Sequence, residues 1–387
     1  MIAAQALAAL FGVALTAAVL ASALETVVLP LKGFTRIARA VFALTDRLLV
    51  HRWRNPRRTA HMRAIYAPVA LVSLPLVWML SVTVAFTFIF WGIGSGTVAH
   101  SFELSGSSLT TLGFSKPDGS ARVWLSFVEA IIGLGLVALL IGYLPTIYTA
   151  YAAREKGMNA LRPFAGTPPS PVTLVDNLHR SGALDNVGVW RQAADWLLTL
   201  DQTHTAFPAL CYFPDAPDQS WVASLGSLLD GAALLLSGAD YLVDQDPPPE
   251  IKGPRLVIAY GIPAIGRIAV AIGLPVEPMM TPSELSARDG LPPDVAVSRA
   301  EYEAALGDLD AVMAVPAGEL DACWSRFAWL RSGYDQALRG LAGLNLAPPA
   351  RWTTDRSVAV GRPRILSGRT LTVDWGTMPD VDAGIGP

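Results

Sequence analysis

Cysteine is almost absent from this chain, whose 387 residues include only Cys211 and Cys323. Two cysteines so far apart provide neither a disulfide framework nor the paired spacing of a zinc site. This scarcity excludes the small secreted domains that disulfides hold together. We expect both side chains to be small buried hydrophobes of a cytoplasmic, reduced domain.

Charged residues are also scarce. They make up 16 % of the chain, whereas 52 % of the residues are hydrophobic. A soluble protein of this size is rarely so apolar, yet the chain is too polar to lie in a membrane throughout. The net charge of -3 does not indicate nucleic-acid binding, which needs a concentrated basic surface. The composition therefore favours a membrane protein with an additional domain outside the membrane.

Three long apolar runs are present, at residues 2–30, 66–94 and 123–150. Each is long enough for a spanning helix, which needs about 20 apolar residues. The first run is an N-terminal transmembrane helix in this interpretation, and Glu25 is its only acid. A cleaved signal peptide is the alternative, but no basic region precedes the run and the run is longer than a signal sequence usually has.

The basic residues between the runs predict the orientation. Residues 31–65 contain one acid, Asp46, and nine basic residues, namely Lys32, Arg36, Arg39, Arg47, Arg52, Arg54, Arg57, Arg58 and Arg63. Loops rich in lysine and arginine stay in the cytoplasm. Arg154, Lys156 and Arg162 follow the third run, so residues 95–120 should face outward. We expect a multi-pass protein of the inner (plasma) membrane with a cytoplasmic C-terminal domain.

The basic segment 31–65 is predicted to contact membrane lipid. Its arginines do not recur at every third position of an apolar helix, as those of a voltage sensor do. A polar loop or an interfacial amphipathic helix in contact with anionic lipid is the favoured interpretation.

A short polar segment lies between the second and third runs. Residues 101–111 have the length of a helix that enters from outside and stops partway, and Thr110-Thr111-Leu112-Gly113-Phe114-Ser115 closes the segment. Extended backbone of this kind can turn successive carbonyls and a threonine hydroxyl toward an axis, where they replace the water shell of a cation. Such backbone is tolerated at membrane depth only when protein surrounds it.

This segment resembles the pore loop of the potassium-channel family, in which a threonine precedes a filter of the form Thr-Val-Gly-Tyr-Gly. The preceding threonine is Thr110, and the five filter places are taken by Thr111, Leu112, Gly113, Phe114 and Ser115. The resemblance covers about residues 66–150 and is closest to the bacterial type with two transmembrane helices, here with an extra N-terminal helix. It implies an outer helix at 66–94, a pore helix and filter at 101–116, and an inner helix at 123–150.

The resemblance also implies a function. Four copies of the chain would form a homotetramer that conducts potassium ions passively, with the carbonyls of Thr111 to Phe114 and the Thr111 hydroxyl as ligands. Ser115 stands where the family has its last glycine, Lys116 where an acid usually follows, and Phe114 where it has a tyrosine. In this arrangement Ser115 would have to adopt a left-handed backbone conformation. That conformation is unfavourable in free energy for any residue other than glycine. These departures argue against strict potassium selectivity.

The third run contains the residues that would support and gate the pore. Glu129 could brace the filter through Ser107, Ser108 or the backbone, or it could extend to the outer surface. Gly133 and Gly135, with Pro145, could form a hinge that opens the cytoplasmic mouth. Close packing of helices is an equally plausible role for the small residues.

The remainder of the chain predicts a helical cytoplasmic domain at 172–345, after a proline-rich linker at 163–171 and before an extended or disordered tail at 346–387. A further apolar run at 255–274 contains Arg267, which favours a buried helix over a fourth span. His179, His204 and Asp201 are the only candidate catalytic or metal group, and surface or capping roles explain them better. We therefore expect no enzyme and no cofactor.

The predicted fold is an all-α membrane protein with a potassium-channel-like pore module and a helical cytoplasmic domain. An alternative function makes the membrane part an anchor for a helical binding or signalling module, with a non-conducting or nonselective pore.

Overall fold

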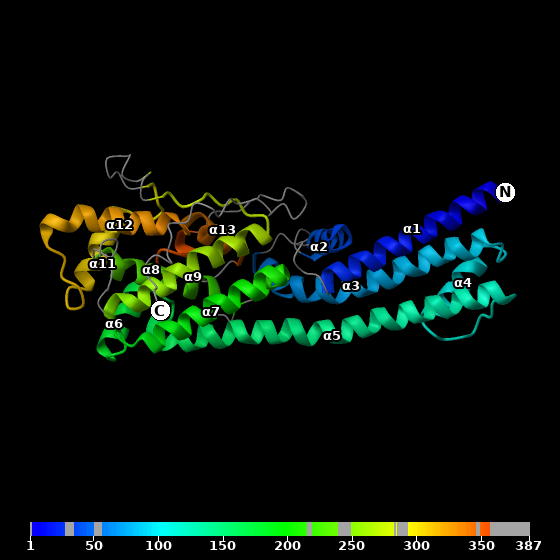
Figure 1. Ribbon diagram of the computed structural model, residues 1–387, viewed down its shortest axis with the longest axis horizontal. Helices are drawn as coiled ribbons and strands as arrows, with labels where there is room; N and C mark the ends of the chain where they lie inside the picture. The colour runs from blue at the N-terminus through cyan, green and yellow to red at the C-terminus, as the bar shows by residue number, and fades with distance from the viewer. Residues whose placement is uncertain are drawn as a thin grey trace, which may run out of the picture. The chain divides into compact units, whose positions relative to one another are not determined.

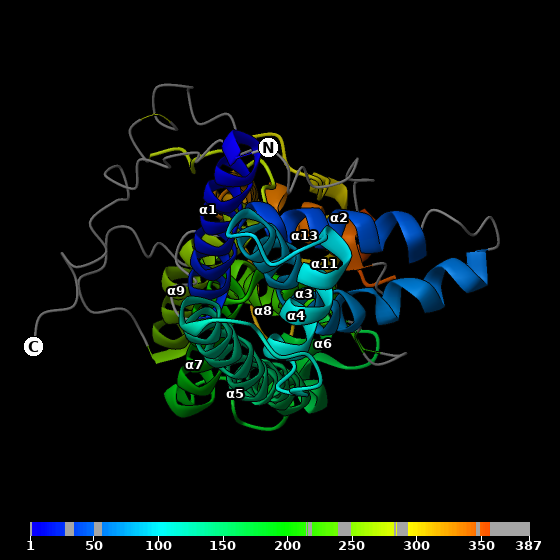
Figure 2. The same ribbon diagram turned by 90° about the vertical axis from the view of Figure 1, so that its right-hand side faces the viewer.

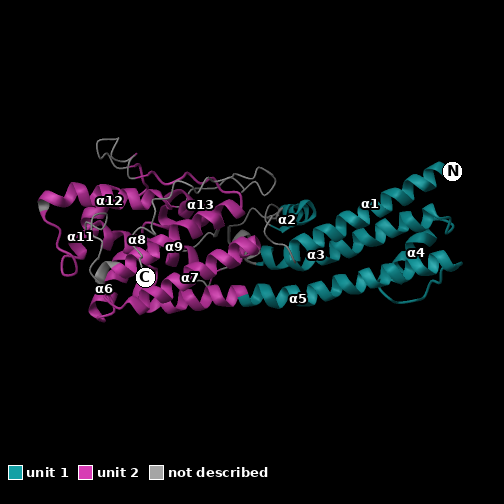
Figure 3. Cartoon of the chain, viewed as in Figure 1, with its two compact units in different colours: residues 1–149 teal, residues 150–387 magenta. Residues whose placement is uncertain are grey.

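The structure is a computed structural model that describes residues 2–27, 35–49, 56–213, 215, 219–238, 249–281, 284, 293–345 and 349–356. Within these residues every regular element is a helix and no strand occurs (Figure 1). The predicted all-α class is confirmed. The chain divides into two compact units, residues 1–149 and residues 150–387 (Figure 3).

The first unit contains the helices α1 (Ile2–Val27), α2 (Arg36–Leu49), α3 (Pro56–Gly92), α4 (Val98–Leu109) and the first part of α5 (Ser120–Ala165). Three of its helical segments are long and apolar enough to cross a membrane, namely α1, Ile65–Gly92 of α3, and α5. They correspond to the three predicted spans. Pro68 and Pro75 lie inside α3, which continues through both of them.

Helices α1 and α3 lie side by side in both views (Figures 1 and 2). Two glycines allow this approach. A Cβ atom on Gly12 of α1 would lie 2.4 Å from the carbonyl oxygen of Ala85, and one on Gly92 of α3 would lie 2.5 Å from that of Gln5. Small residues at such crossings bring helix backbones into van der Waals contact, the main attraction between helices in lipid.

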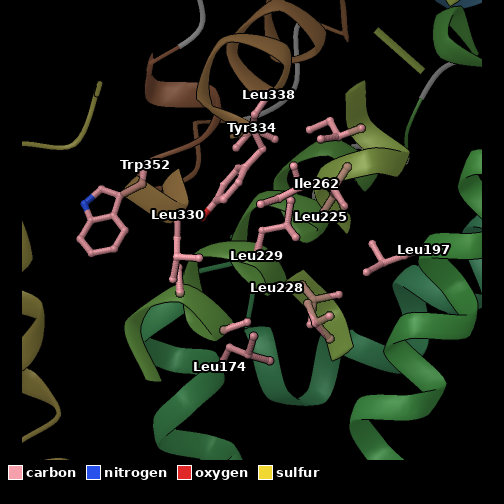
Figure 4. Close-up of a cluster of buried hydrophobic side chains, with 14 of the residues drawn as sticks. Leu174, Leu197, Leu225, Leu228, Leu229, Ile262, Leu330, Tyr334, Leu338 and Trp352 are labelled. Atoms are coloured by element: carbon pink, nitrogen blue, oxygen red, sulfur yellow. The ribbon is translucent and has the colours of Figure 1, made fainter. Parts of the chain in front are cut away.

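The second unit is built around α8 (Trp221–Ser237), all of whose residues are buried. Helices α6 (Pro171–Arg180), α9 (Pro249–Ala271), α12 (Leu320–Ser332) and α13 (Asp335–Asn345) contact α8, and α7 (Val187–Ala206) packs against α9. Figure 4 shows leucines of α8, including Leu225, Leu228 and Leu229, beside Leu330, Tyr334 and Leu338. The remaining elements are α11 (Arg299–Asp308) and the 3-10 turns η2 (Pro208–Tyr212), η3 (Ala317–Glu319) and η4 (Thr354–Arg356).

A buried ion pair crosses the core of the second unit. Arg331 Nη1 of α12 lies 2.6 Å from Asp230 Oδ2 of α8, and both side chains are fully buried. The Tyr334 hydroxyl donates to Asp230 over 2.7 Å, and Arg331 Nη2 donates to the carbonyl of Trp352 over 2.8 Å. Trp352 is itself buried. The prediction of an extended or disordered tail from residue 346 is therefore wrong for residues 349–356, because the Trp352 side chain packs into this core.

The end of α5 also belongs to the second unit. Met158, Leu161 and Ala165 recur at helical spacing and are buried in its core. Trp196 of α7 packs so closely on α5 that a Cβ on Gly157 would overlap its ring. The helix runs on to Ala165, so the first residues of the predicted linker at 163–171 are helical.

Helix α9 contains the fourth segment, Lys252–Ala271, that is long and apolar enough to span a membrane. It packs against α7 and α8 within the second unit. Arg267 forms an ion pair with Asp201 of α7, with Nη2 and Oδ2 2.6 Å apart, and Gly261 lies against Leu229 of α8. The charge that argued against a fourth span thus has a partner on a neighbouring helix.

Candidate functional site

Helix α4 occupies the place of the predicted pore helix. Its first turn is capped by Thr97, whose side chain accepts a hydrogen bond from the backbone N–H of His100 over 3.2 Å. Leu104 and Leu109 are buried, and α4 packs against α3. The helix covers Val98–Leu109, which is three residues earlier at its start than the sequence predicted.

The segment after α4 folds back onto the helix end. The N–H of Thr111 donates to the Ser108 carbonyl over 3.0 Å, and the N–H groups of Leu112 and Gly113 donate to the Ser107 carbonyl over 3.0 and 3.3 Å. Thr110 donates from its N–H and its hydroxyl to the Gly106 carbonyl. The last carbonyls of α4 are therefore occupied by the N–H groups of the loop.

The far end of the loop is held by one side chain of α4. The Ser107 hydroxyl accepts a hydrogen bond from the N–H of Ser115 over 3.0 Å and lies 3.5 Å from the Ser115 carbonyl. Ser107 thus contacts the loop through its backbone carbonyl and through its hydroxyl. From the sequence, Ser107 was expected only as a possible partner of Glu129.

Several N–H groups of the loop have hydrogen-bond partners on α4, but within the described part of the chain the carbonyls of residues 111–114 do not. Among the described residues, no hydrogen bond is donated to the carbonyls of Thr111, Leu112, Gly113 or Phe114. The loop is also exposed within the chain, with Leu112 71 % and Phe114 66 % accessible. Four successive acceptors are consequently available to a ligand.

The backbone reaches this arrangement through two left-handed residues, Thr111 (φ 56°) and Gly113 (φ 71°). Gly113 was expected there, because glycine adopts this region without steric cost. The expectation that Ser115 would also be left-handed is wrong, and Thr111 takes that conformation instead. The chain must reverse immediately after α4, and it does so at Thr111. A β-branched residue with positive φ costs about 1–3 kcal/mol.

Glu129 links three helices behind the loop. Its side chain on α5 is fully buried, and Oε1 is hydrogen-bonded to the Ser105 hydroxyl of α4. The Ser105 oxygen also lies 2.9 Å from the carbonyl of Thr83 on α3. The structure thus places Glu129 against α4 and not at the outer surface. The partner is Ser105, which the sequence alone did not single out.

Gly133 lies one turn further along α5, where this helix passes close to the end of α4. A Cβ atom at this position would stand 2.3 Å from the carbonyl oxygen of Leu109. Gly135 has no atom within 4 Å of such a Cβ. Close packing therefore accounts for Gly133, whereas a hinge at Gly135 and Pro145 stays a prediction. Helix α5 is continuous through all three residues.

Arg122, which no sequence pattern marked, ties the N-terminal end of α5 to the end of α3. Its guanidinium donates to the carbonyls of Ile93 and Gly94 over 3.1 and 2.8 Å, and to that of Asp118 over 3.1 Å. Only contacts over long sequence distances identify this role.

Of the three residues considered for catalysis or metal binding, Asp201 and His204 have separate partners, and His179 lies in the last turn of α6. Asp201 pairs with Arg267, and His204 is buried against Trp221 with ring centroids 4.9 Å apart. Burial, with the nearby Arg154 guanidinium, lowers the pKa of His204 to about 3. No group of three or more potential metal ligands occurs in the described part of the chain.

Comparisons with protein-family models, with curated proteins and with solved structures find no match to this chain.

Proposed function

We propose that this protein is a pore-loop channel that conducts cations, potassium above all, passively across a membrane. The observation that carries the proposal is the backbone of residues 111–114, whose N–H groups at Thr111, Leu112 and Gly113 are bonded to α4 while the four carbonyls have no donor among the described residues. Carbonyl oxygens presented in this way can replace the water shell of a dehydrated cation.

One chain supplies four backbone acceptors on one side of an ion, so a closed coordination shell needs further copies. A homotetramer would surround the axis with four such loops. The exposed apolar side chains of α5 are consistent with contacts to other copies and to lipid; they include Trp124, Phe127, Ile131, Leu134 and Ile141. In this assembly ions in neighbouring sites repel one another, which speeds their exit.

Two polar contacts would hold the filter in place. Ser107 fixes Ser115 at the outer end of the loop, and Glu129 joins α5 to Ser105 of α4 behind it. Gating would act at the cytoplasmic end of α5, at the filter, or at both. Lys116, repeated around the outer mouth, would lower the local cation concentration and slow entry most strongly at low salt.

The test is flux through the purified protein in liposomes, with potassium and sodium compared and with barium as a blocker. Gly113→Ala should abolish flux while assembly is retained, because Gly113 has positive φ. Gly106→Ala is the matched control: it lies in α4 and a Cβ there meets no atom within 4 Å, so flux should persist. Normal flux in Gly113→Ala would contradict the filter assignment.

A second candidate function is a membrane-anchored helical binding or signalling module. It is favoured by Ser115 and Lys116 in the loop and by the separate core of the second unit. Assembled wild-type protein that passes no cation under any gradient would support this alternative. Equal potassium and sodium flux would instead indicate a nonselective pore.

A further inference from the structure

Helix α2 has a buried face, an exposed apolar face and, beside the apolar face, an exposed basic face. The buried face packs inside the first unit through the side chains of Ala38, Val41, Phe42 and Thr45. A second is apolar and exposed: Leu44 and Leu48 are each 56 % accessible, and Ala40 is exposed one turn earlier. At 100° per residue these three positions lie within about 40° of Leu44, and the exposed Arg36 and Arg47 lie about 60–80° to one side.

Hydrogen bonds to α1 and α3 fix the position of α2 along these two apolar helices. Thr35, immediately before α2, is hydrogen-bonded to Ser22 near the end of α1 over 2.7 Å. The Tyr66 hydroxyl donates to the carbonyl of Phe42 over 3.3 Å, and the two rings pack edge to face. Tyr66 stands at the beginning of the apolar segment Ile65–Gly92 of α3. Helix α2 therefore lies where two spans leave the hydrocarbon.

We propose that this exposed face of α2 docks into a leaflet of anionic phospholipid. Leu44 and Leu48 insert among the acyl chains, and Arg36 and Arg47 contact the phosphates beside them. Charge complementarity selects this occupant, because residues 31–65 hold nine basic residues and one acid. The proposal does not depend on ion conduction.

The first experiment measures insertion, with the full-length protein in vesicles of phosphatidylglycerol and phosphatidylcholine. A fluorophore is attached at Leu48→Cys, since both native cysteines are buried. Lipid-borne quenchers should reduce its emission and aqueous iodide should not. The control label at Arg180→Cys, a site on α6 whose side chain is 74 % exposed, should show the reverse. A Leu48 label quenched by iodide alone overturns the proposal, and one shielded from both quenchers overturns it in favour of a contact between copies.

The second experiment measures the preference for anionic lipid. Retention of phosphatidylglycerol by the purified full-length protein is compared for wild type, Arg36→Gln, Arg47→Gln and the control Arg180→Gln. Each α2 substitution should weaken retention about fivefold at low salt, with a smaller effect at high salt, and the control should leave it unchanged. Equal retention in all four proteins overturns the charge-based part of the proposal.

Discussion

Two apolar helices of this protein, α5 before residue 150 and α8, have opposite surroundings. Every residue of α8 is buried by other helices of the second unit. Helix α5 keeps Ile131, Leu134 and Ile141 exposed, although it is also an apolar helix. The second unit removes apolar surface from water by folding on itself. The first unit leaves such surface uncovered, and its long apolar helices suggest that it lies in a membrane.

The two units also treat buried polar groups differently. The second unit encloses an ion pair, Asp230 with Arg331. In the first unit several buried hydroxyls bond to backbone carbonyls, as Thr87 does to Thr83 and Thr45 to Val41, and Glu129 bonds to Ser105. Small neutral groups bonded to nearby backbone remain satisfied in lipid, whereas charges are usually placed against protein or water. This contrast predicts which substitutions each unit tolerates.

The largest effect is expected at the buried ion pair. Asp230→Asn removes one of the two carboxylate partners of the buried Arg331, which keeps Asp335 at 2.9 Å from its Nε atom, and should lower the free energy of unfolding by about 3 kcal/mol. The more exposed pair is the control: Arg267→Gln should cost about 1 kcal/mol or less. Denaturant unfolding in mild detergent, followed by circular dichroism, measures both. An equal loss of unfolding free energy in the two variants would contradict the inference that the buried ion pair matters more than the exposed one.

The next effect depends on pH and concerns His204. Its folded-state pKa of about 3 lies below its ordinary value of 6.5, so the unfolded chain binds this proton more readily. Stability should therefore fall as pH drops from 6.5 toward 3, by up to about 1.4 kcal/mol per pH unit.

Burial acts in the opposite sense on Asp215 and raises its pKa to about 6. The effect of Asp215 on the pH dependence of stability cancels when wild type is compared with His204→Leu, since both proteins contain Asp215. Unfolding at pH 7 and pH 4 should show a larger acid loss in wild type. Equal losses would contradict the buried neutral state of His204.

A smaller effect distinguishes two glycines of α5. Gly133→Ala forces a methyl group against the Leu109 carbonyl and should cost about 1–3 kcal/mol and impair flux. Gly135→Ala meets open space and should leave stability equal or raise it by up to about 1 kcal/mol. Thermal unfolding and liposome flux test the pair. Impaired flux in Gly135→Ala with normal stability would favour the hinge.

The smallest effect is expected at the brace of the loop. Ser107→Ala removes the hydrogen bond to Ser115 and should cost about 1 kcal/mol, too little to unfold the protein. We expect a lower ratio of potassium to sodium flux. Ser108→Ala is the control, because its hydroxyl bonds within α4 to Leu104. Identical ratios in the two variants would argue against a role for Ser107 in the filter.

The sequence by itself determined the features that depend on local composition. Long apolar runs marked three of the helices that are long and apolar enough to span a membrane, and a short segment before Thr110 marked α4. Gly113 was recognisable because its left-handed backbone is a property of one residue. Hydropathy and glycine conformation act over a few neighbouring residues, so no tertiary information is needed to read them.

Only the tertiary structure decided which distant residues meet. Glu129 contacts Ser105, Gly133 meets the Leu109 carbonyl, and Trp352 from the predicted tail enters the core beside Arg331. Each contact joins segments separated by many residues, and its partner depends on how whole helices pack. The left-handed Thr111 has the same origin, because the chain reverses there to bring the loop onto α4. Packing selects one set of partners among many that local patterns allow.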